Sequence, residues 1–140
     1  MKKFEFSNKS VKYAGTLLIV YGVLFYLLWF SEIIPSLSSP ELPSKIKEIG
    51  GVTNPVHILD IALVLPAFII SAILLFKRSV WGIVFVPSFL AFSILMSLTI
   101  SWIIIYVNIK SQISDYTIAI VFVLHSLISL SGLLLMKKTN

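Results

Sequence analysis

The chain has 140 residues, of which 58% are hydrophobic and only 12% are charged, and its mean hydropathy is +1.01. A soluble domain carries about 25% charged residues, and one this small could not bury so much apolar surface, so a soluble fold is excluded. The absence of cysteine excludes disulfides and thiol chemistry. The net charge is +5, but the basic residues lie at the ends of apolar runs, which indicates contact with lipid headgroups and not with nucleic acid.

Four apolar runs predict four membrane-spanning helices. Each run has the roughly 20 residues that a helix needs to cross a ~30 Å hydrocarbon core. Helices are expected because lipid offers no partner to unpaired backbone groups. We therefore predict an all-α, polytopic membrane protein: one domain over residues 1–140, a four-transmembrane-helix bundle with spans at about 13–34, 56–76, 80–108 and 116–136.

The first span, 13–34, carries Glu32 near its end and leads into an outer loop at 35–55. A cleaved signal peptide is disfavoured, because the apolar run exceeds the 7–15 residues of a signal sequence. Pro35, Pro40 and Pro43 are expected to end any continuing helix. A loop of this length is often a lid or binding loop, and a flexible strap is the alternative.

The second span, 56–76, begins with a histidine and a carboxylate. Asn54 and Pro55 suit the N-cap and first position of a helix. His57 and Asp60, three residues apart, then share one helix face. At 1.5 Å per residue, Asp60 lies roughly 7–8 Å inside the helix start, at a depth similar to that of Glu32. We predict that Glu32, His57 and Asp60 form one polar cluster at the outer side.

The third and fourth spans carry the remaining polar candidates. The third is too long for an upright span, so we expect it to tilt, to bend at Pro87 or to leave its first turn in the headgroup region. Tyr106 and Asn108, at its outer end, lie near the predicted cluster and are candidate supporting or relay residues, as is Asn54. His125 lies ten residues into the fourth span, near the membrane midplane, and would extend such a relay if it faces the bundle interior. Small residues spaced four apart on the third span predict close helix packing: Ser93, Ser97 and Ser101.

The positions of the basic residues predict the topology. Eight lie in the two termini and the connection between the second and third spans, against three on the other side. Because basic residues concentrate on the cytoplasmic side, both termini are predicted to be cytoplasmic, in the cell membrane. The eight are Lys2, Lys3, Lys9, Lys12, Lys77, Arg78, Lys137 and Lys138, and the three are Lys45, Lys47 and Lys110.

Ionisable residues inside spans are functional candidates by default, but several interpretations of the cluster stay open. The side chains could simply satisfy one another and stabilise helix packing. They could line an outward-facing pocket or start a proton or cation path towards His125. Two carboxylates and an imidazole could also bind a divalent metal, although the single His-x-x-Asp pattern only partly matches di-metal helix bundles. We assign no catalytic residue, no firm metal site and no cofactor.

Three stretches resemble a group of four-span bacterial membrane proteins that have no established activity. They are "NPVHILDIALVLPAFIISAILL" at 54–75, the "KRSVWG" that follows, and "WFSEIIP" at 29–35. In that group an N-P-x-H-x-x-D start to the second helix precedes a hydrophobic run and a basic turn. The resemblance implies a four-helix fold in a bacterial membrane, and that Glu32, Asn54, Pro55, His57 and Asp60 belong together.

These observations favour a non-enzymatic protein: an accessory subunit, or a protein that handles a small molecule, an ion or protons at the outer cluster. The alternative is a membrane enzyme or redox partner that uses the same cluster, with a metal or a quinone. The expected partners are the lipid bilayer and either a larger membrane complex or a second copy of the chain, and no nucleic acid is expected.

Overall fold

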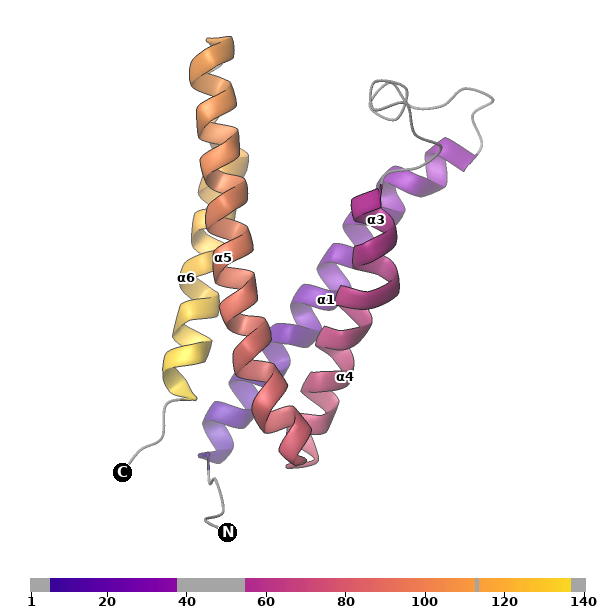
Figure 1. Ribbon diagram of the computed structural model, residues 1–140, viewed down its shortest axis with the longest axis vertical. Coiled ribbons are helices and arrows are strands. Elements are labelled where there is room, and N and C mark those ends of the chain that lie inside the picture. Colours follow the sequence, from indigo (N-terminus) through magenta and orange to yellow (C-terminus); the bar gives the residue numbers. More distant parts are fainter. Residues whose placement is uncertain (1–5, 38–54, 113, 137–140) are drawn as a thin grey trace.

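The computed structural model describes residues 6–37, 55–112 and 114–136, and the regular structure within them is entirely helical (Figure 1). Four stretches of this part of the chain are long and apolar enough to cross a membrane. This confirms the prediction of an all-α fold with four spanning helices. The elements are α1 (Asn8–Leu37), α3 (Pro55–Leu59), the π-helical segment η1 (Asp60–Val64), α4 (Leu65–Phe76), α5 (Val80–Ser111) and α6 (Thr117–Leu135).

The first helix is longer than predicted at both ends. It begins behind Ser7, whose hydroxyl accepts a hydrogen bond from the Ser10 amide at 3.2 Å, as an N-cap residue does. It continues through Pro35 to Leu37, so the expectation that Pro35 ends the helix is wrong. Pro35 removes the donor for the Ser31 carbonyl, but Ser31 is exposed at the helix end, where water can replace that donor. Pro40, Pro43 and most of the predicted loop lie outside the described residues.

The four helices form two antiparallel pairs, α1 with α3–η1–α4 and α5 with α6. Figure 1 shows the pairs together at the end that holds both chain termini and the α4–α5 turn, and apart at the other end. The core follows this arrangement, since no described residue of α1 beyond Gly22 is buried. The apolar core consists of Val11, Ala14, Leu18, Tyr21, Phe68, Ala72, Leu75, Val86, Leu90 and Met136.

The α4–α5 turn joins the two pairs at their common end. Arg78 has a left-handed backbone (φ 55°), and the Arg78 and Ser79 amides donate to the Leu75 and Leu74 carbonyls, both at 2.9 Å. This is the Schellman ending of a helix, with arginine where glycine is usual. The Arg78 guanidinium also donates to the Phe6 carbonyl at 2.8 Å and to the Asn8 side chain. The turn is thereby bonded to the start of α1.

Helix α5 is the longest of the four and provides one continuous surface for α6. Its 32 residues span about 48 Å, well beyond a ~30 Å hydrocarbon core. Ser93, Ser97 and Ser101 are buried along it, as their spacing predicts. The Ser101 hydroxyl donates to the Ala119 carbonyl of α6 at 3.0 Å. In the following turn, the Thr117 amide donates to the Asp115 carboxylate, and this bond lowers the pKa of Asp115.

Candidate functional site

The predicted outer cluster begins with a contact between α1 and α3. His57 Nε2 lies 3.4 Å from Glu32 Oε2. The His57 side chain is 12% exposed, whereas that of Glu32 is 48% exposed. The Glu32 side of the contact is therefore exposed at the surface, and the His57 side is largely buried between α1 and α3. It is an ion pair only when the imidazole is protonated, because a neutral histidine carries no charge.

Trp29 connects this contact to Asp60, the third predicted member. Its indole N–H donates to Asp60 Oδ2 at 3.0 Å, and its ring lies 4.3 Å from the His57 ring, centroid to centroid. Trp29 and Glu32, three residues apart on α1, thus face His57 and Asp60 on the opposite helix. We call Trp29, Glu32, His57 and Asp60 the outer cluster.

Trp29 was not among the residues predicted for this cluster. The signal that would have placed it in the cluster is its i,i+3 spacing from Glu32, which puts both on one helix face.

The second helix widens at η1, which begins three residues after His57, and Pro66 explains why. A proline in a helix interior clashes with the carbonyl four residues earlier, here that of Ala62. In η1 the backbone adopts π-helical bonding, in which the Leu65 amide donates to the Asp60 carbonyl. In this register the Ile61 carbonyl would bond to residue 66, but Pro66 has no N–H. The Tyr26 hydroxyl of α1 donates to that carbonyl instead, at 3.0 Å.

His125 belongs to a second polar site, deeper in the bundle. Its Nδ1 lies 3.2 Å from the Ser97 hydroxyl, and its ring lies 4.0 Å from that of Tyr21, edge to face. His125 therefore faces the bundle interior. Its Nε2 is buried with no hydrogen-bond partner among the described residues.

The Ser129 hydroxyl joins this deeper site to the α6 backbone. It bonds to the Tyr21 hydroxyl at 3.1 Å and to the His125 carbonyl at 2.9 Å. Helices α1, α5 and α6 all contribute to the site, so it ties the two helix pairs together.

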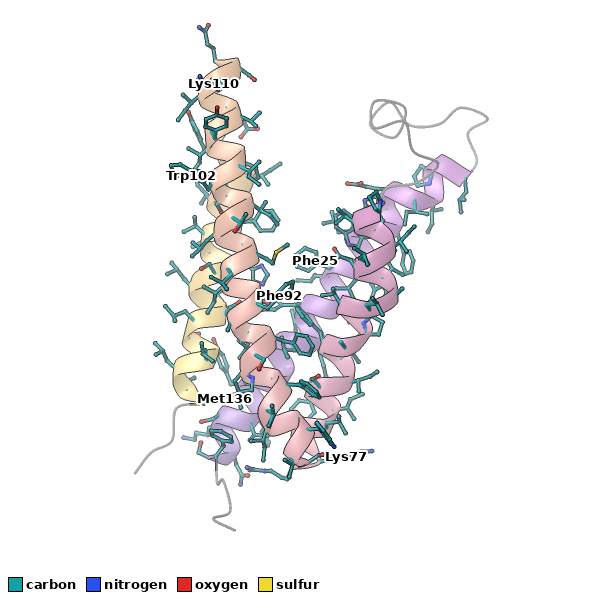
Figure 2. The ribbon with its side chains drawn as sticks, in the orientation of Figure 1. Phe25, Lys77, Phe92, Trp102, Lys110 and Met136 are labelled. Carbon is teal, nitrogen blue, oxygen red and sulfur yellow. The ribbon has the colours of Figure 1, made fainter. Side chains whose placement is uncertain are left out.

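The two polar sites are separated along α1 by an aromatic side chain. Tyr21, Phe25 and Trp29 are spaced four apart and share one face. Tyr21 and Phe25 contact His125, and Trp29 contacts His57. Figure 2 shows Phe25 on α1 opposite Phe92 on α5, at the level where the pairs begin to diverge. The Phe25 ring has no exchangeable proton. A proton relay between the two sites would therefore need a route around this side chain.

The other predicted supporting residues lie elsewhere. Tyr106 and Asn108 are on α5, in the pair that diverges from α1 and α3. Asn108 is buried, and its amide donates to the Asp115 backbone carbonyl, which closes the α5–α6 turn. Tyr106 is exposed, with the Lys110 ammonium 5.9 Å from its ring. Asn54 lies outside the described residues.

The outer cluster holds groups suited to proton exchange and to cation binding. Two carboxylates and one imidazole are present, and Trp29 occupies one oxygen of Asp60. Within the described ranges, no three His, Asp or Glu side chains are grouped so that they could hold a metal ion together. When His57 is protonated, its contact with Glu32 becomes an ion pair.

Comparison with known proteins gives no match: no family model, no curated protein and no solved structure matches this chain. The resemblance to the four-span bacterial group stays a prediction from three sequence stretches. The chemistry of the site is accordingly argued from its residues.

Proposed function

We propose that this multi-pass membrane protein handles protons at its outer cluster. The observation that carries the proposal is the 3.4 Å contact between His57 and Glu32, which joins α1 to α3 at the boundary between an exposed carboxylate and a largely buried imidazole. Histidine is the side chain that ordinarily changes charge between pH 5 and 8. Protonation of His57 would therefore change the contact between the two helices.

The surroundings of His57 support proton uptake. Two acidic side chains lie near it, Glu32 from α1 and Asp60 three residues along its own helix, so a protonated imidazole would have neighbours of opposite charge. Trp29 holds Asp60 through its indole N–H, so this carboxylate is fixed close to the ring. We propose that protonation of His57 turns the Glu32 contact into an ion pair and draws the outer end of α1 towards α3.

The orientation and the location of the protein belong to this proposal. The topology that places the cluster on the outside rests on the eight-to-three distribution of basic residues. A bacterial cytoplasmic membrane rests on the resemblance of the second span. Under this proposal the protein is not an enzyme, and it acts alone or as a subunit that senses or passes on external pH.

Trp29 provides a direct test, because a protonated imidazole quenches indole fluorescence more strongly than a neutral one. In a Trp81→Phe, Trp102→Phe background, Trp29 is the sole tryptophan. We expect its emission to fall as external pH is lowered from 8 to 5 in reconstituted vesicles. The change should vanish in His57→Gln and persist in His125→Gln, the matched control in the other polar site. A His57→Gln protein with the unaltered pH response would refute the proposal.

Proton movement is the second measurement. Vesicles loaded with a pH-sensitive dye should acidify in response to an external acid pulse faster with the protein than without it. Asp60→Asn should reduce that difference at least fivefold, whereas Asp115→Asn, also at the outer end but outside the cluster, should leave it unchanged. If the fluorescence response is present and flux is absent, the cluster binds protons without passing them across. If both are absent, the cluster has only a structural role.

A further inference from the structure

A hollow at the opposite end of the molecule, far from the outer cluster, has the composition of a ligand site. Its volume is about 790 Å³, and it lies between the first turns of α1 and the last turn of α6. Its lining includes Lys9, Lys12, Tyr13 and Thr16 from α1, and Leu134 and Leu135 from α6. In Figure 2 the labelled Met136, directly after α6, and Lys77 mark this end of the molecule, and Lys110 marks the other.

The α1 side of the hollow is basic and rich in hydroxyl groups. Lys9, Lys12 and Thr16 follow one another at i, i+3 and i+7, so they lie on one face of the helix. All three are exposed, which leaves both ammonium groups able to reach a ligand. The hollow also lies at the first turns of α1, where the helix dipole favours an anion. Its described lining contains basic, hydroxyl-bearing and apolar side chains, so the charge it presents is positive.

The α6 side of the hollow is apolar, and its wall is fixed. Leu134 and Leu135 line this side, and they are 57% and 52% exposed. The Ser131 hydroxyl donates to the Ile128 carbonyl at 2.7 Å and is 2.8 Å from the Tyr13 hydroxyl, so it accepts a bond from Tyr13. This bond holds the Tyr13 ring between the two helices. The hollow therefore suits an amphipathic molecule, with an anionic head at the basic α1 side and an apolar part at the α6 side.

We propose that this hollow binds an anionic phospholipid, with its phosphate between Lys9 and Lys12 and an acyl chain along Leu134 and Leu135. The charge of the lining argues for the anionic head, and the exposed leucines of a membrane-spanning helix argue for the chain. The lipid would bridge α1 and α6. This proposal does not depend on proton handling by the outer cluster.

The test is a lipid titration of the full-length protein in neutral detergent, followed by native mass spectrometry. Phosphatidylglycerol and phosphatidylcholine with identical acyl chains are compared. We expect phosphatidylglycerol to bind at least tenfold more tightly. Because each lysine near an anionic lipid contributes about a fivefold factor, the double variant Lys9→Gln, Lys12→Gln should lose about thirtyfold. The matched control, Lys77→Gln with Lys110→Gln, removes the same charge outside the hollow and should change binding less than threefold.

Two further arms separate a site from general charge attraction. Thr16→Phe fills the hollow without a change of charge, and it should weaken phosphatidylglycerol binding while the thermal midpoint of the lipid-free protein stays within a few degrees. Glycerol phosphate alone should fail to displace the lipid at a hundredfold excess. Equal binding of the two lipids, an equal loss in the control double variant, or displacement by glycerol phosphate would each overturn the proposal.

Discussion

At the scale of single residues, the hydrogen bond from Tyr26 to the Ile61 carbonyl supplies a donor that the backbone of the helix cannot supply. Pro66 leaves that carbonyl without a helical donor, and within a membrane no water is at hand to replace it. The Tyr26 hydroxyl donates to it from the neighbouring helix at 3.0 Å. This single bond therefore compensates for the missing N–H of Pro66 and joins α1 to η1.

Tyr26→Phe should destabilise the folded protein by about 1 kcal/mol, since it leaves a backbone carbonyl unsatisfied at a helix interface. The free energy of unfolding, measured by denaturation with sodium dodecyl sulfate in mixed micelles, checks this value. Tyr106→Phe, which alters an exposed tyrosine, serves as the control and should have no effect.

A double-mutant cycle tests the reason for the loss. In a Pro66→Ala background the helix regains an N–H, so Tyr26→Phe should cost markedly less. An undiminished cost in that background would mean that Tyr26 stabilises the protein by packing alone.

The sequence predicted the members of the outer cluster better than their connections. Glu32, His57 and Asp60 were placed at one depth by the rise of a helix per residue, and depth is insensitive to how a helix is rotated about its axis. The contacts of Trp29 and Tyr26 depend on that rotation and on the widening at η1. The i,i+3 spacing of Trp29 and Glu32 places Trp29 on the face of the cluster, but the Tyr26 bond cannot be read from the sequence of α1, because it depends on the proline of the opposite helix.

At the scale of elements, the start of the second helix was predictable from its capping residues, and Pro35 was a source of error. Pro55 begins α3 as its place in the sequence predicts. Pro35 lies within the last turn of α1, and Pro87 within α5, because a proline removes one bond but does not by itself end a helix whose neighbouring bonds remain. Proline therefore begins and widens the second span, and it lies within both α1 and α5.

The α4–α5 hairpin depends on the absence of a side chain at Gly82. A Cβ there would lie 2.1 Å from the Leu75 nitrogen and 2.4 Å from the Leu74 carbonyl carbon. These are backbone atoms of a helix end, so they cannot move aside without opening the hairpin. Gly82→Ala should therefore destabilise the protein by at least about 3 kcal/mol, the upper part of the range for overpacking.

Gly15→Ala is the matched control for this prediction. Its Cβ would meet the Phe76 ring at 2.5 Å, but that ring is 41% exposed and can rotate away. The same denaturation measurement should show a loss for Gly15→Ala of less than half that for Gly82→Ala. Equal losses would mean that the hairpin can adjust its backbone.

At the scale of the whole molecule, the divergence of the two helix pairs explains why the predicted outer layer divides. Lipid and apolar side chains are equally good neighbours for leucine, so hydrophobicity does not determine which faces of membrane helices pack together. Depth placed Tyr106 and Asn108 level with Glu32, but depth carries no information on lateral distance. Small residues do determine such packing, because they let two helices approach closely. On α5 these are the buried Ser93, Ser97 and Ser101, on the side that packs against α6.

The distribution of charge gives the last prediction, which concerns orientation. Of the described residues, Lys9, Lys12, Lys77 and Arg78 lie at the end that holds the termini, and Lys110 lies at the other end. We expect the first end to remain in the cytoplasm. The chain contains no cysteine, so single introduced cysteines report position without background. In intact bacterial cells a membrane-impermeant maleimide should label Ser111→Cys, and it should label Thr139→Cys only after the membrane is permeabilised. Labelling of Thr139→Cys in intact cells would place the Glu32–His57 contact on the cytoplasmic side, where it would respond to internal and not to external pH.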